Sequence, residues 1–260
     1  MAKTSSSSLK KLLAIDRIPL ILERLGRTTR RPVHARRASP LDSLMLTVLS
    51  QNTTDANSGR AFEQLKARFP KWEDVLNARP REIADTIRSG GLGEIKSGRM
   101  KQILERIEKE RGRLDLGFLR RMPMADVREY LLGLPGIGRK TAAVVMLFSL
   151  GMPAFPVDTH VLRVSRRLGL VPPRTTMDQA HDLYEEMLKP ARGSGGNRRR
   201  PSPGGSDAGD AALMLDLHLG LIRHGRTVCI ARRPRCSACR LLDLCPRIGV
   251  TAAAEERGGQ

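Results

Sequence analysis

The sequence predicts an all-α protein. Apolar residues recur at helical spacing along most of the chain, Pro or Gly separates successive segments, and no alternating apolar and polar run is long enough for a strand. Apolar residues make up 40% of the chain but aromatic residues only 3%, so the core must consist mainly of aliphatic side chains, Met and Ala. Leu and Ala have high helix propensities, which agrees with this class.

The positions of the breaks set the expected elements. Residues 1–8 are expected to form a polar tail, and a first helix covers residues 9–25 with a break or kink at Pro19. Ser39 and Pro40 begin the next helix, because Pro is favoured in a first helical turn. Shorter helices are expected at residues 54–69, 71–77, 80–88, 95–111 and 124–132.

Residues 193–210 differ in composition, since they contain Gly, Ser, Pro and Arg and almost no apolar side chains. Such a segment gains too little from burial to offset its ordering entropy. We therefore expect a flexible surface insertion there, and a second tail at residues 249–260.

The formal net charge is +19, from 46 Lys and Arg residues against 27 Asp and Glu residues. A nucleic acid is the expected partner, because each neutralised phosphate releases a counterion; an anionic membrane surface and plain solubility are weaker explanations. The longest apolar run, residues 142–150, is too short to span a membrane. The N-terminus lacks a secretory signal, so the cysteines are expected in a reducing, cytoplasmic compartment.

A glycine-rich corner lies between two helical segments at residues 134–142. Gly136 and Gly138 leave room for backbone N–H groups to approach an anion, and the next helix adds its positive N-terminal end. Arg139 brings a further positive charge. This arrangement can grip a DNA phosphate without reading a base, although an ordinary helix–turn–helix corner also uses glycine.

Lys140 and Asp158 are the candidate catalytic residues. The helix end, partial burial and the neighbouring arginine all disfavour a charged amine at Lys140, and a neutral amine can form a Schiff base with a sugar carbon. A solvated, phosphate-binding lysine is an alternative of equal weight. Asp158 is suited to cap the next helix, and its carboxylate could also accept a proton and stabilise positive charge on a sugar ring. His160 is a third candidate, although a helix-start role suits it better.

All cysteines of the chain lie within 17 residues, at the spacing C-x6-C-x2-C-x5-C. Four thiolates at such spacing predict a metal or an iron–sulfur cluster. Zinc is the rival, but zinc ribbons have two C-x2-C pairs and this segment has one. The arginines between the first two cysteines suit bidentate phosphate contact. The residues concerned are Cys229, Cys236, Cys239 and Cys245, and Arg232, Arg233 and Arg235.

Together these segments resemble the endonuclease III family of helix–hairpin–helix DNA glycosylases. The matching strings are LPGIGRKTAAVV, VDTHVLRV, HGRTVCIARRPRCSACRLLDLC and, less closely, LSQNTTD. The resemblance implies a six-helix domain at residues 41–152, a second domain from residues 9–40 and 153–248 that carries a 4Fe–4S cluster, and a DNA-binding cleft between them. It assigns the Schiff base to Lys140, a catalytic carboxylate to Asp158 and the cluster ligands to the four cysteines.

The implied activity is removal of oxidised pyrimidines from double-stranded DNA, followed by β-elimination 3′ to the abasic sugar. A monomer in a bacterial cytoplasm, associated with the nucleoid, is expected. Gln51 and Asn52 depart from the Ala-Gln pair typical of the family, where the Gln fills the gap left by the flipped nucleotide. Leu92 matches the residue that wedges bases apart, while Gly90 is smaller than usual.

Three other functions remain open from the sequence. A monofunctional or mismatch-type glycosylase uses an attacking water and lacks a lysine at position 140, so Lys140 argues against it. A non-catalytic DNA-binding protein would not need Lys140 and Asp158. A zinc-binding regulator is the least favoured alternative.

Overall fold

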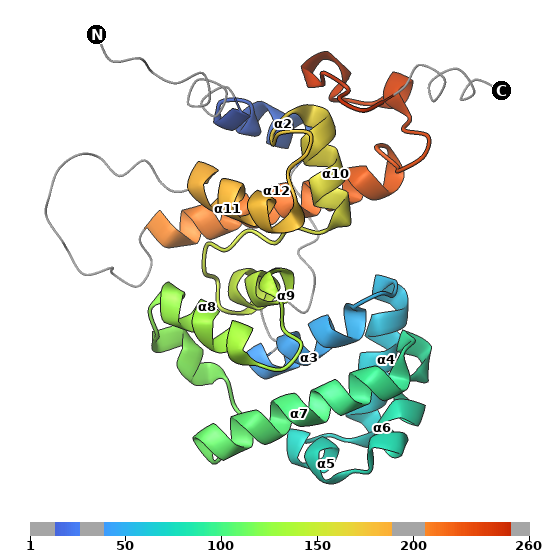
Figure 1. Ribbon diagram of the computed structural model, residues 1–260, viewed down its shortest axis with the longest axis vertical. Coiled ribbons are helices and arrows are strands. Elements are labelled where there is room, and N and C mark those ends of the chain that lie inside the picture. The colour runs from blue at the N-terminus through green and yellow to red at the C-terminus, as the bar shows by residue number, and fades with distance from the viewer. Residues whose placement is uncertain (1–13, 27–38, 189–205, 251–260) are drawn as a thin grey trace, which may run out of the picture. The chain divides into compact units, whose positions relative to one another are not determined.

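The computed structural model describes residues 14–26, 39–188 and 206–250 (Figure 1). Contacts group the chain into two compact units, one from Met1–Arg31 with Pro153–Gln260 and the other from Pro32–Met152. Every regular element in the described residues is helical, so the predicted all-α class is confirmed. None of these helices is both long and apolar enough to cross a membrane.

The unit from Pro32–Met152 contains every helix predicted between residues 40 and 133, with ends that differ by no more than two residues. Capping explains why the starts were readable. Ser39 Oγ accepts a hydrogen bond from the Asp42 amide at 3.0 Å, and Thr54 Oγ1 accepts one from the Asn57 amide at 3.2 Å. The helices are α3 (Pro40–Ser50), α4 (Asp55–Arg68), α5 (Trp72–Asn77), α6 (Pro80–Thr86), α7 (Gly93–Arg111), α8 (Met124–Gly133) and α9 (Arg139–Val144).

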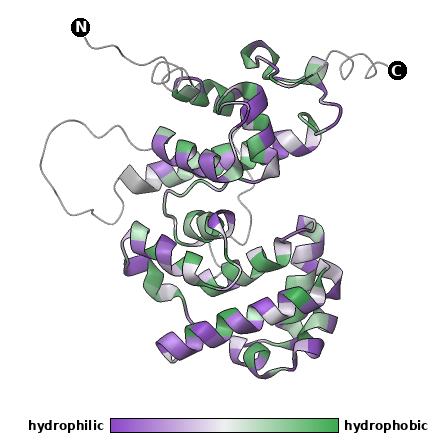
Figure 2. Ribbon diagram, viewed as in Figure 1, coloured by the Kyte–Doolittle hydropathy of each residue, from purple (hydrophilic) through white to green (hydrophobic). Residues whose placement is uncertain are grey.

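Helix α7 is the longest element of this unit, and hydrophobic and hydrophilic bands alternate along it (Figure 2). Met100, Ile103, Leu104 and Ile107 are fully buried, at the spacing expected for one face of a helix. The opposite face is polar. As a result, the apolar face of α7 packs into the core of this unit, and charged side chains lie near both ends of the helix.

The second unit contains α2 (Ile18–Leu25), α10 (Thr159–Leu168), α11 (Met177–Met187) and α12 (Ser206–Thr227). The expected break near Pro19 is present, because α2 begins at Ile18 and Pro19 lies in its first turn. Phe155 stacks on Tyr184 with ring centroids 4.2 Å apart, which fixes the chain just before α10.

One prediction in this unit was partly wrong. The expected flexible insertion ran to residue 210, but α12 begins at Ser206. Ala211, Met214 and Leu217 are buried along α12, so the apolar face that stabilises this helix lies beyond the Gly- and Ser-rich stretch. Residues 1–8, 193–205 and 251–260, also predicted to be flexible, lie outside the described residues.

Candidate functional site

The hairpin between α8 and α9 has the geometry expected of a phosphate-binding corner. Gly136 has φ +69°, a left-handed conformation that glycine adopts readily. The Ile137 amide donates to the Leu134 carbonyl at 3.2 Å, and the Ile137 side chain is buried and anchors the turn. Gly136 and Gly138 are exposed, so their backbone groups are open to a ligand.

Arg99 connects this hairpin to the early motif around Gln51. The Arg99 Nη1 donates to Gln51 Oε1 at 2.6 Å, and Gln51 Nε2 donates to Thr141 Oγ1 at 3.5 Å. The Arg99 side chain crosses directly against Gly136, where an added Cβ would lie 2.2 Å from Arg99 Nε. The sequence did not single out Arg99, because Gln51 is 48 residues away and no local pattern connects the two residues.

Gly136→Ala is expected to lower the free energy of unfolding by about 1–2 kcal/mol, since an L-residue is strained in the left-handed region and the new methyl group must displace Arg99. Gly138→Ala is the matched control. Gly138 has φ −97° and open space around it, so this variant should lose only the smaller preference of an N-cap position for glycine over alanine. Urea unfolding of both variants checks the prediction, and equal losses of stability would contradict it.

Lys140 occupies the first turn of α9, as expected, but it is exposed and not partly buried. No acidic residue lies in that turn, so no carboxylate from the helix start competes for the amine. Arg139 beside it is half-buried. The segment that follows includes the π-helical stretch η4 (Val145–Ser149) and is almost entirely buried. Its packing fixes the position of the backbone at Lys140.

Asp158 is buried, with 8% of its surface exposed, and caps α10 through a 2.7 Å hydrogen bond from the Val161 amide to Oδ1. The preceding Pro156 carbonyl contacts His218 Nδ1 at 2.9 Å, which further fixes this segment. His160 is half-buried, and its Nδ1 lies 3.2 Å from Arg163 Nη2, in agreement with a role at the helix start. Lys140 and Asp158 belong to different units.

Asn52 and Leu92 share an unusual backbone conformation. Their φ angles are +56° and +54°, and they are two of three non-glycine residues with positive φ in the described residues. Such a conformation is costly for L-residues and persists where the surroundings enforce it. Both side chains are exposed, that of Leu92 by 50%. Ile95, one helical turn further on, is 59% exposed and was not anticipated as a second apolar group here.

The four cysteines line one cavity together with His224 and Arg167. The amides of Leu241 and Arg247 donate to Cys239 Sγ and Cys245 Sγ, each at 3.4 Å. Burial raises the pKa of the Cys239 thiol, and the neighbouring cysteines raise it further. Within the described residues, no three His, Cys, Asp or Glu side chains are arranged to hold a metal ion.

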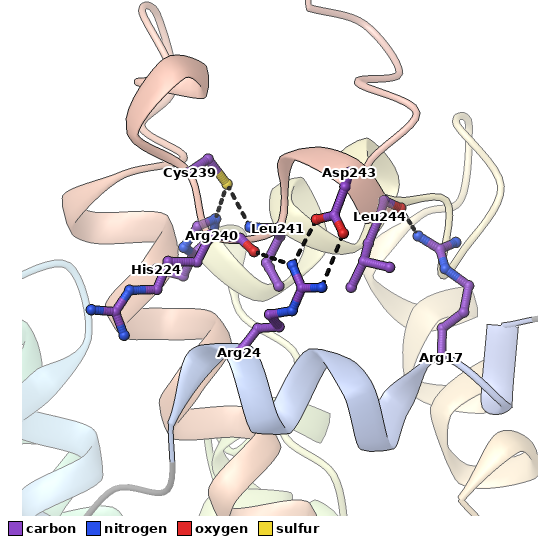
Figure 3. Close-up of polar contacts among 8 residues, drawn as sticks. All are labelled: Arg17, Arg24, His224, Cys239, Arg240, Leu241, Asp243 and Leu244. Carbon is purple, nitrogen blue, oxygen red and sulfur yellow. Dashed lines mark hydrogen bonds and ion pairs between the residues drawn. The ribbon is translucent and has the colours of Figure 1, made fainter.

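Arg24 of α2 and Arg17, the residue before this helix, bind the cysteine loop through its backbone and through Asp243 (Figure 3). Arg24 donates to both carboxylate oxygens of Asp243, at 2.8 and 3.0 Å, and to the Arg240 carbonyl at 3.1 Å. Arg17 donates to the carbonyls of Leu244 and, at 3.0 Å, of Leu168. These contacts attach the loop to α2 and to the end of α10.

Helix α10 holds the first cysteine of the loop. Arg167 donates to the carbonyls of Ile230 and Ala231, each at 2.7 Å, and to Cys229 Sγ at 3.4 Å. Arg163 donates to the Cys229 carbonyl at 3.1 Å. Because Asp158 caps the same helix, α10 connects the candidate carboxylate to the cysteine loop within one unit.

The predicted arginine loop is present between the first two cysteines. Pro234 is buried, and the Arg235 amide donates to the Val228 carbonyl at 2.9 Å. These two contacts fix the position of the loop. Its three arginine side chains are exposed, as a phosphate-binding role requires. They are Arg232, Arg233 and Arg235.

Comparison with known proteins shows which family the chain belongs to. Residues 45–190 match the family described as HhH-GPD superfamily base excision DNA repair protein. Endonuclease III of Thermotoga maritima is 30% identical over 86% of this chain and 92% of its own length. An Arabidopsis thaliana protein that is provisionally named a DNA glycosylase is 49% identical over 52% of this chain. The match covers 46% of the length of that relative.

A solved structure of a trapped endonuclease III–DNA covalent intermediate is also similar, with a TM-score of 0.65, 26% identity and coverage of 91% of this chain and 94% of that one. The chain therefore belongs to the HhH-GPD superfamily of base-excision repair proteins. Within it, the chain is a member of the endonuclease III family of DNA glycosylases.

Proposed function

We propose that this protein is a bifunctional DNA glycosylase and abasic-site lyase that removes oxidised pyrimidines, with Lys140 as nucleophile and Asp158 as the catalytic carboxylate. The observation that carries the proposal is the placement of Lys140, an exposed amine in the first helical turn directly after the Gly136 hairpin. An amine held beside a phosphate-binding corner is within reach of the sugar attached to that phosphate.

The reaction requires an extrahelical nucleotide, because the anomeric carbon cannot be reached inside the duplex. The amine of Lys140 attacks C1′, and the base leaves with its bonding electrons and takes up a proton. The C1′–O4′ bond then breaks, O4′ takes up a proton, and a protonated Schiff base remains between Lys140 and C1′. Loss of the C2′ proton then expels the 3′ phosphate. The carboxylate of Asp158 stabilises the positive charge that develops on the sugar and the amine.

We also propose that the four cysteines hold a 4Fe–4S cluster. The number and kind of donors fit this group, because four cysteines line one cavity and two of their thiols accept backbone N–H groups. When bound, such a cluster supplies a covalent crosslink of the loop. The protein's own contribution is to present Arg232, Arg233 and Arg235 to DNA phosphates.

Borohydride trapping tests the lyase mechanism. Wild-type protein is incubated with a duplex containing one oxidised pyrimidine, or one abasic site, and borohydride reduces any Schiff base to a stable covalent complex. We expect a complex with wild-type protein and none with Lys140→Ala. Arg139→Ala is the matched control, because it removes the neighbouring charge but leaves the nucleophile, and it should still be trapped.

Failure of wild-type protein to be trapped on either duplex, despite binding to it, would overturn the lyase assignment. Base release without trapping would then indicate a monofunctional glycosylase. Trapping only on the abasic duplex would retain the Schiff-base lysine and exclude oxidised pyrimidine as the substrate.

A further inference from the structure

Lys96 is a buried lysine that the proposed mechanism does not use. Its side chain is 2% exposed, and its Nζ donates to the Leu49 carbonyl at 2.6 Å and to the Gly90 carbonyl at 2.8 Å. Burial lowers the pKa of this amine below its ordinary range. Lysine is rarely buried unless it is paired, so this position indicates a specific task.

Both acceptors stand at the ends of helical segments. Leu49 is the penultimate residue of α3, and Gly90 ends the short 3-10 helix η2 (Arg88–Gly90). The last carbonyls of a helix lack intrahelical partners and carry partial negative charge, so an ammonium group is well suited to them. A single amine on α7 therefore joins the end of α3 to the end of η2.

The chain leaves both of these ends through a strained residue. Asn52 follows Leu49 by three residues, Leu92 follows Gly90 by two, and both have left-handed backbone conformations and exposed side chains. Gly90 itself has little space for a side chain, because an added Cβ would lie 3.1 Å from the Ala61 Cβ and one of the two groups would have to shift. The absence of a side chain at Gly90 thus lets η2 pack closely against α4 with its last carbonyl in contact with the Lys96 amine.

We propose that Lys96 is a positioning residue that fixes the separation between the Asn52 and Leu92 loops, so that both side chains enter the DNA base stack together. The proposal rests on the proposed glycosylase function. Lys96 is buried and does not touch DNA; it acts through the two carbonyls. Loss of this tether should therefore impair opening of the duplex and leave the chemistry at the sugar intact.

Lys101 provides a matched control on the same helix. Its Nζ donates to the carbonyls of Leu76 and Ala78, at 2.5 and 2.8 Å, and so ties down the end of α5 in the same way. No residue with positive φ follows these carbonyls closely. Lys96→Met and Lys101→Met each remove one such tether, but only the first involves the proposed DNA-probing loops.

The test compares two substrates under single-turnover conditions. One is a duplex with an oxidised pyrimidine, and the other is a single strand with an abasic site, which has no base stack to open. Relative to wild type, we expect Lys96→Met to cleave the duplex about 10- to 100-fold more slowly, because small misplacements of positioning groups have effects of this size. It should also lose the fluorescence rise of 2-aminopurine placed beside the lesion, yet cleave the single strand at the wild-type rate.

Lys101→Met should behave as wild type on both substrates. Equal loss in the two variants, equal loss of Lys96→Met on both substrates, or no loss at all would overturn the proposal. If Lys96→Met does not fold, Gly90→Ala moves the same carbonyl and should show the same difference between substrates. A wild-type protein that cleaves neither substrate overturns the proposed function itself, which is a distinct outcome.

Discussion

Asp158→Asn is expected to slow base removal by about 10²- to 10³-fold without destabilising the protein, because the substitution removes a negative charge and keeps the helix cap. The Asp158 carboxylate accepts a 2.7 Å hydrogen bond from the Val161 amide. An Asn side-chain oxygen accepts the same bond, and Asn is as good an N-cap as Asp. Single-turnover base release and urea unfolding measure the two effects separately.

Asp158→Ala is the informative companion variant. It removes the charge and the cap together, so it should show the same loss of rate and an additional loss of about 1 kcal/mol in the free energy of unfolding. The comparison separates the two roles of one side chain. If Asp158→Asn released the base at the wild-type rate, Asp158 would be a structural cap only, and the catalytic carboxylate would have to be another residue.

The capping role of Asp158 was predicted from the sequence, because capping is local. Ser39, Thr54 and Asp158 each accept a bond from an amide three residues later, and such a pattern lies within a few letters of the chain. The turn at Gly136 and the helix start that follows it were also predicted, because both depend on neighbouring residues in the sequence.

The contacts that organise the candidate site could not be predicted in the same way. Lys96 and Leu49 are 47 residues apart, and Arg99 and Gln51 are 48 apart, so neither pair leaves a signature in local spacing. In the sequence, Lys96 also looks no different from an exposed lysine on a charged helix. Its burial depends on the packing of α7 against neighbouring segments, which no window of sequence records.

The solvent exposure of Lys140 also could not be predicted from the local sequence. Lys140 was expected to be partly buried, yet the buried surface begins at Thr141 and the lysine is exposed. The first turn of a helix can present one residue to solvent while the next is buried, since successive side chains are about 100° apart. The accessible amine strengthens its candidacy as a nucleophile.

Cys239→Ser is expected to abolish the visible absorption of the purified protein and to lower the free energy of unfolding. The Cys239 thiol lies among the other three cysteines and accepts the Leu241 amide, so it is central to the proposed cluster. Structural metal centres contribute directly to folding, and their loss frees the loop that they close. Affinity for duplex DNA should fall as well, because Arg232, Arg233 and Arg235 would no longer be held in place.

Ser237→Ala is the matched control, since Ser237 is exposed and lies between Cys236 and Cys239 without being a proposed ligand. It should retain the absorption, the stability and the affinity. Partial retention of the fold in Cys239→Ser is expected, because Arg24 still binds Asp243 and Arg167 still binds the Ile230 carbonyl. Metal analysis decides the identity of the centre: iron and sulfide in the wild type support a cluster, whereas one zinc per chain and no visible band would replace it by a zinc site.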